Sequence, residues 1–164
     1  MRRRALLVSL VAAVGGLMAV GARSGAVAQE GTPPPFEIAP GVTGEALAFA
    51  PGAEAPALYR LTFEPGVTYA IEPSPAISLV YGEVGALTFA LDAPITVTRA
   101  GATDAPGEGV AAGDEFELAA GDYATFPPLV GGEVRNDGEA AASVVVAEIV
   151  PDGMATPAAG TPES

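Results

Sequence analysis

Short apolar runs separated by glycine and proline dominate the central part of the chain. Between Ala57 and Phe63, polar and apolar side chains alternate, so that one face of the segment is more polar than the other. This period of two residues is typical of a β-strand with one side against a core. Strands are predicted for the following segments: Ala46 to Ala50, Ala57 to Phe63, Ile77 to Tyr81, Ala86 to Leu91, Ile95 to Arg99, Glu115 to Leu118, Tyr123 to Phe126, Gly132 to Asn136 and Ala142 to Val150.

So many short strands, with no sustained spacing of 3.6 residues among them, predict an all-β protein. Two facing sheets or a closed barrel are expected, because one open sheet of this length would leave costly edges. The turn sequence Asn136-Asp137-Gly138 predicts that the last strand runs antiparallel to the strand before it. The glycine-rich stretch from Gly101 to Glu115 is predicted to be a loop inserted between strands.

The first 28 residues have the features of a secretory signal peptide. Arginines at positions 2, 3 and 4 precede an apolar stretch from Ala5 to Ala22, and Ala26-Val27-Ala28 supplies small residues before a cleavage site. We therefore expect cleavage after Ala28 and a secreted or extracytoplasmic protein. The alternative is an uncleaved membrane anchor at the N-terminus, because the apolar stretch is near the lower length limit for a transmembrane helix.

Four segments follow from these patterns: a signal peptide at 1–28, a Pro-rich flexible segment at 29–44, a β-barrel at 45–150 and a flexible C-terminal tail at 151–164. The chain has 164 residues and 49% of them are hydrophobic, which is enough for one compact core. Aromatic residues expected near the core or the mouth of the barrel are Tyr59, Tyr69, Tyr81, Phe63 and Phe89.

Charge excludes several classes of partner. Four of the seven basic residues lie before position 29 and all 20 acidic residues lie after it, so the cleaved chain would carry 3 minus 20, or −17. Nucleic acid binding requires clustered cations, and Arg60, Arg99 and Arg135 are isolated from one another. Anionic membranes are equally poor partners, so no stable membrane contact is expected once the signal is cleaved. The carboxylates are scattered, as on a solvated surface that resists aggregation.

Two segments keep the spacing of a pair of known sequence motifs. The first motif falls on Gly66, Glu72, Ser74, Ser78 and Gly85, and the second on Gly121, Pro127, Leu129, Gly132 and Asn136. In this spacing the chain resembles the cupin family, whose fold is a double-stranded β-helix, or jelly-roll barrel. The resemblance covers residues 57–150 and implies the same fold here.

The resemblance also indicates where a metal site would lie. The family's metal-binding histidines correspond to Glu72, Ser74 and Gly132, and its ligand glutamate to Ser78. The chain contains no histidine and no cysteine, so these positions are not expected to hold a transition metal, and no cofactor is predicted. They stay as candidate ligand-binding positions. Leu129 replaces a glycine of the motif, so the local turn is not predicted.

Three functions are compatible with these features. The favoured one is a non-enzymatic module that binds a small molecule or a protein, without metal. The second is an enzyme that uses Glu72 as an acid or base, or that binds a hard cation; a second acid near Glu72 would favour it. The third is a structural or assembly protein, for example a homodimer that pairs through its sheets. A large apolar outer face of a sheet would favour this function.

Overall fold

A computed structural model describes residues 34–51, 55–102 and 105–149, and within these ranges the protein consists of strands and loops without a helix. No membrane-spanning helix therefore occurs in the described part of the chain. The strands are β1 (Phe36–Ala39), β2 (Val42–Phe49), β3 (Pro56–Phe63), β4 (Thr68–Ile71), β5 (Ile77–Val84), β6 (Ala86–Leu91), β7 (Ile95–Thr98), β8 (Glu108–Val110), β9 (Glu115–Ala119), β10 (Tyr123–Phe126), β11 (Gly132–Arg135) and β12 (Ala142–Ile149).

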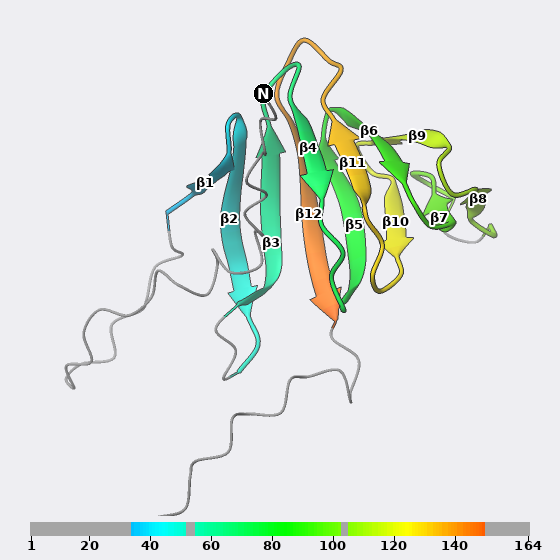
Figure 1. The fold of residues 1–164 in the computed structure, drawn as a ribbon, viewed down its shortest axis with the longest axis horizontal. Coiled ribbons are helices and arrows are strands. Elements are labelled where there is room, and N and C mark those ends of the chain that lie inside the picture. The colour runs from blue at the N-terminus through cyan, green and yellow to red at the C-terminus, as the bar shows by residue number, and fades with distance from the viewer. Residues whose placement is uncertain (1–33, 52–54, 103–104, 150–164) are drawn as a thin grey trace, which may run out of the picture.

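These strands form two antiparallel sheets. The larger sheet has eight strands in the order β1-β2-β3-β12-β5-β10-β7-β8, and the smaller has four in the order β4-β11-β6-β9. Figure 1 shows the strands of the larger sheet side by side from β1 to β10, with β4 and β11 of the smaller sheet in front. Hydrogen bonds do not join the two sheets into one continuous ladder. The prediction of two facing sheets in a jelly-roll arrangement is confirmed.

Alternating apolar residues place the core between the sheets. In β6, Leu87, Phe89 and Leu91 are buried while the residues between them are half-buried. The ring of Phe89 stacks on Phe116 of β9 at 5.3 Å and meets Phe126 of β10 edge to face at 5.7 Å. Aromatic pairs in these geometries add to the free energy gained by burying the rings. Phe89 thus ties a strand of the smaller sheet to one of the larger.

Every strand predicted from the sequence overlaps an observed strand, but three strands were missed. β1, β4 and β8 have only four, four and three residues, and each lies beside glycines or prolines that indicate turns and loops. β1 and the start of β2 fall within 29–44, so the flexible segment predicted there is wrong for residues 36–44. β8 lies in the predicted inserted loop and pairs with β7, so this loop contains the second strand of a hairpin.

The connection from β11 to β12 crosses between the two sheets, which the sequence did not predict. The turn signal is real, since the Gly138 amide donates a hydrogen bond of 3.1 Å to Asn136 Oδ1. However, β11 pairs with β4 and β6, whereas β12 pairs with β3 and β5 in the other sheet. Six residues separate the two strands, which is longer than the two-residue loop of a tight hairpin and allows the chain to cross between sheets.

Candidate functional site

A cavity of about 300 Å³ lies between the two sheets. It is located toward the end of the barrel where β4 and β12 finish and β5 begins, which is the lower end of these strands in Figure 1. Most of its wall is apolar. The polar side chains that line it are Glu45, Tyr59, Tyr69, Glu72, Ser74, Ser78 and Glu148.

Three of the four predicted site residues line this cavity. Glu72 follows the end of β4 and is exposed, whereas Ser74 and Ser78 are half-buried. Ser78 lies at the start of β5, where its Cα pairs with that of Glu148 on β12. These three positions of the motif therefore lie in the lining of one cavity.

Gly132, the fourth predicted position, does not line the cavity. It starts β11 with a φ of +149°, and a Cβ added to it would lie 2.2 Å from the Ala90 carbonyl oxygen and 2.9 Å from Leu91 Cα. Only glycine adopts this backbone without a clash. The neighbouring Glu133 does not supply a ligand in place of Gly132, because it is half-buried and accepts a hydrogen bond from Arg135. Val134 is the residue of β11 that lines the cavity. The prediction that Gly132 contributes to a ligand site is therefore not supported by its position.

Glu148 and Tyr59 form a polar pair inside the cavity that the sequence did not reveal. The Tyr59 hydroxyl donates a hydrogen bond of 2.8 Å to Glu148 Oε1. Burial, together with the negative charge of Glu148, raises the pKa of Tyr59 well above its ordinary value, so the phenol stays protonated. The signal available in the sequence was the alternation Val144, Val146, Glu148, which places the acid on the buried face of the last strand.

Tyr69 on β4 extends this polar group toward Glu72. Burial raises the pKa of Tyr69, and the charge of Glu72 adds to the increase. Two neutral phenols, Tyr59 and Tyr69, thus share the cavity with the two carboxylates. Tyr81, which was expected near the core or mouth, instead lies on the outer face and is 45% exposed.

In the described part of the chain, each of the three arginines forms ion pairs with carboxylates other than those of Glu72 and Glu148. Arg60 pairs with Glu45 and Glu83. The remaining ion pairs join Arg99 to Glu108 and Asp122, and Arg135 to Glu115, Glu133 and Asp137. None of these three arginines forms an ion pair with Glu72 or Glu148. Within the described part of the chain, the carboxylates of Glu72 and Glu148 in the cavity are therefore not neutralised by a protein cation, whereas Glu45 is paired with Arg60.

The donor atoms at the predicted site do not fit the metal that the cupin resemblance implies. Ser74 and Ser78 offer hydroxyls, which are weak ligands, and Gly132 has no side chain. In residues 34–51, 55–102 and 105–149, no group of three or more histidine, cysteine, aspartate or glutamate side chains is arranged to hold a metal ion. The side chains at these positions are therefore better suited to hydrogen bonding than to coordinating a transition metal.

The backbone at Leu129 is left-handed. Leu129 has a φ of +63°, in the left-handed region that favours glycine, and its side chain is 63% exposed. Its amide donates a hydrogen bond of 2.6 Å to the carbonyl of Ser74. The β10–β11 loop is thereby attached to the segment that carries Glu72 and Ser74.

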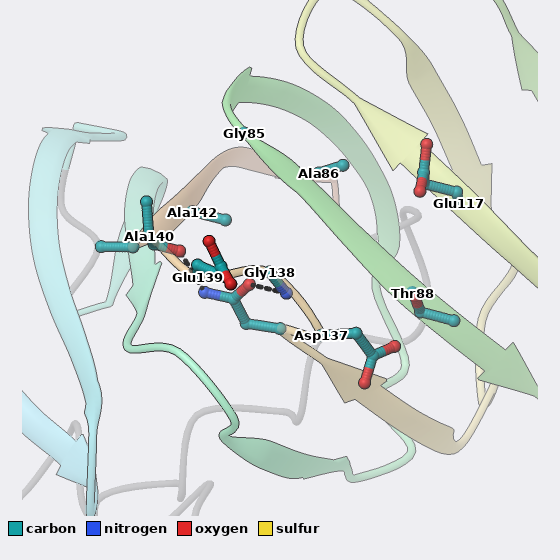
Figure 2. Close-up of a pocket in the computed structure, with 11 residues that line it drawn as sticks. Gly85, Ala86, Thr88, Glu117, Asp137, Gly138, Glu139, Ala140 and Ala142 are labelled. Atoms are coloured by element: carbon teal, nitrogen blue, oxygen red, sulfur yellow. Dashed lines mark hydrogen bonds between the residues drawn. The ribbon is translucent and has the colours of Figure 1, made fainter.

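A second hollow lies at the opposite end of these strands, beside the turn between β11 and β12. Figure 2 shows this hollow. The side chain of Asn136 lines it and donates a hydrogen bond of 2.9 Å to the Ala140 carbonyl. The carboxylates of Glu117, Asp137 and Glu139 are spread around its edge and do not converge. Its polar atoms stabilise the turn, and it lacks the apolar wall of the first cavity.

No family model matches the sequence, and no curated protein matches it. Among solved structures, the chain is similar to a cupin 2 domain-containing protein from Halorhodospira halophila (17% identity, 68% of this chain and 66% of that chain, TM-score 0.48). It is also similar to Drosophila melanogaster CENP-C bound to CAL1 (10% identity, 85% and 93%, TM-score 0.49) and to an RmlC-like cupin from Shewanella frigidimarina (14% identity, 76% and 89%, TM-score 0.43).

Proposed function

We propose that this protein is a secreted, metal-independent binding module that takes a small, largely apolar molecule into the cavity between its sheets. The observation that carries the proposal is the cavity itself. It has about 300 Å³ of space, an apolar wall and a few polar groups gathered at one end, which is the usual composition of a small-molecule site.

The positions of Glu72, Ser74 and Ser78 support this function over metal binding. They correspond to family metal ligands, yet their oxygen atoms suit hydrogen bonds to an organic ligand better than coordination of a transition metal. Secretion is part of the proposal and is supported by the basic start, the apolar stretch and the Ala26-Val27-Ala28 site; these residues lie outside the described part of the chain.

A cavity-filling variant tests the binding function. Ser78→Phe places a ring into the cavity from β5, and we expect it to abolish binding of small aromatic compounds measured by titration calorimetry. Leu79→Phe is the matched control, because Leu79 is the next residue of β5 and is 41% exposed on the outer face. Equal binding by both variants would contradict the proposal. Metal analysis of untagged protein should also find less than one equivalent of transition metal per chain.

An enzymatic function is the second candidate. It would require a second acid near Glu72, and Glu148 lines the same cavity as Glu72. A carboxyl pair in a partly apolar site can transfer protons to and from a bound substrate. Chemical conversion of a bound compound that is lost in both Glu72→Gln and Glu148→Gln would favour this candidate over simple binding.

An assembly function is supported by one surface. On the outer face of β5, Leu79 and Tyr81 are 41% and 45% exposed, and Val84 at the end of the strand is 55% exposed. Exposed apolar patches of this kind mark contact surfaces between proteins. Sedimentation at several protein concentrations measures whether the chain forms a homodimer, and Tyr81→Lys should weaken any dimer that uses this face.

A further inference from the structure

We propose that the ligand of this cavity is a small protonated amine, whose apolar body packs between the sheets and whose ammonium group faces the carboxylates of Glu72 and Glu148. This inference rests on the proposed binding function and adds the chemical class of the ligand.

All charged side chains that line the cavity are acidic. Its charged residues are Glu45, Glu72 and Glu148, and no lysine occurs in the chain. Arg60 neutralises Glu45, which leaves the other two carboxylates without a cation among the described residues. An anionic ligand would be repelled by both of them, and a neutral one would gain nothing from their charge. A cation supplies the missing charge.

The polar groups are also suited to an ammonium donor. Glu148 accepts one hydrogen bond at Oε1 from Tyr59, and a carboxylate has about four acceptor sites, so Glu148 can accept further bonds from a ligand. Because burial and the nearby carboxylates keep the phenols of Tyr59 and Tyr69 protonated, their rings stay neutral. The faces of such rings attract cations.

The remaining wall determines the body of the ligand. Phe63, Phe89 and Phe126 line the inner part of the cavity and are 1%, 3% and 5% exposed. Its volume of about 300 Å³ is at the lower end of ligand sites, which suits a compound with one ring or a short chain. The ligand class is therefore an amine with a compact apolar group.

Three matched probes test this inference by titration calorimetry at pH 7: benzylamine, benzyl alcohol and benzoate. They share one ring and differ in charge. We expect benzylamine to bind about tenfold more tightly than benzyl alcohol, and benzoate to bind more weakly than both. The preference for the amine should decrease in high salt, because added ions screen the charges of partly exposed carboxylates.

Variants identify the groups responsible. Glu148→Gln still offers Tyr59 a carbonyl oxygen and Glu72→Gln changes an exposed side chain, so both should fold. Each should reduce the preference for benzylamine over benzyl alcohol several-fold. Glu139→Gln removes the same charge at the opposite end of the barrel and is the matched control.

The outcomes separate the two proposals. Binding of benzyl alcohol without a preference for benzylamine, or a preference that persists in both glutamine variants, would refute the amine inference and leave the binding function intact. Failure of all three probes to bind would count against both. A preference for the amine that is lost in the cavity variants and kept in Glu139→Gln would support both.

Discussion

The hydroxyl of Tyr59 and the carboxylate of Glu148, 89 positions apart in the sequence, are joined by a hydrogen bond of 2.8 Å inside the cavity. The bond links β3 to β12, neighbouring strands of the larger sheet. It also gives a polar end to a cavity whose other lining is mostly apolar. The same pair therefore contributes to the stability of the sheet and to the chemistry of the proposed site.

Replacing Tyr59 by Phe should lower the free energy of unfolding by about 1 to 2 kcal/mol, because the partly buried Glu148 loses its donor. Chemical denaturation at pH 7 measures this. Tyr81→Phe removes a hydroxyl from the exposed outer face and should change stability by less than about 0.5 kcal/mol. Equal effects of the two substitutions would show that the hydrogen bond does not contribute.

Tyr59 also predicts how stability depends on alkaline pH. Its pKa in the folded protein lies above the ordinary value of 10.0, so the unfolded chain releases this proton first. The contribution of Tyr59 is complete below pH 10 and is lost as pH rises further. Unfolding measured between pH 8 and about pH 11 should show a decline that is smaller in Tyr59→Phe. An identical decline in both proteins would contradict the burial of this phenol.

Restoring a histidine at Gly132 should not restore a metal site. The side chain would begin 2.2 Å from the Ala90 carbonyl oxygen, in a backbone conformation that disfavours every residue with a Cβ. We expect Gly132→His to lower stability by about 3 kcal/mol or to prevent folding, and Gly132→Ala to behave similarly. Gly66→Ala is the matched control, since Gly66 also has a positive φ but no atoms within 4 Å of an added Cβ. A stable Gly132→His protein that binds one zinc ion would refute this interpretation.

The sequence predicted the parts of this fold that depend on local alternation. The segment from Ala57 to Phe63 shows a period of two and forms β3, with Tyr59, Leu61 and Phe63 lining the cavity. Glu72, Ser74 and Ser78, which the motif spacing singled out, line one cavity, because motif spacing reflects where turns and strand ends occur.

Other features depend on contacts that a sequence pattern does not contain. Glu148 could be assigned to a buried face, but its partner Tyr59 is determined by the pairing of β12 with β3. Gly132 was considered only as a lost ligand, whereas its backbone packs against Ala90 of β6. The Asn136 turn predicted a last strand antiparallel to the one before it, but not that the chain crosses between sheets there. Strand order and close backbone approach are tertiary properties in each case.

Leu129→Gly should stabilise the protein, although it removes an apolar side chain. Leu129 is 63% exposed and has a left-handed φ of +63°, a conformation that costs a residue with a Cβ about 1 to 2 kcal/mol. Glycine removes that strain but adds freedom to the unfolded chain, so a net gain of up to about 1 kcal/mol is expected. Thermal unfolding measures it. A large loss would show that the Leu129 side chain makes a contact needed for folding.

Acid stability should depend on Asp122, which is 5% exposed. Burial alone would raise its pKa, but hydrogen bonds from the Ala100 amide at 2.8 Å, from Arg99 and from the Ala119 amide hold it below the ordinary value of 3.8. The unfolded chain therefore takes up this proton at a higher pH than the folded one, and the stabilisation is lost as pH falls through the folded pKa.

Asp122→Asn should lower the free energy of unfolding by about 2 kcal/mol at pH 7, and its difference from the unmodified protein should shrink toward pH 3. Asp114→Asn, at an exposed turn, is the matched control. A difference that stays constant from pH 7 to about pH 3 would show that packing, and not the carboxylate charge, accounts for the role of Asp122.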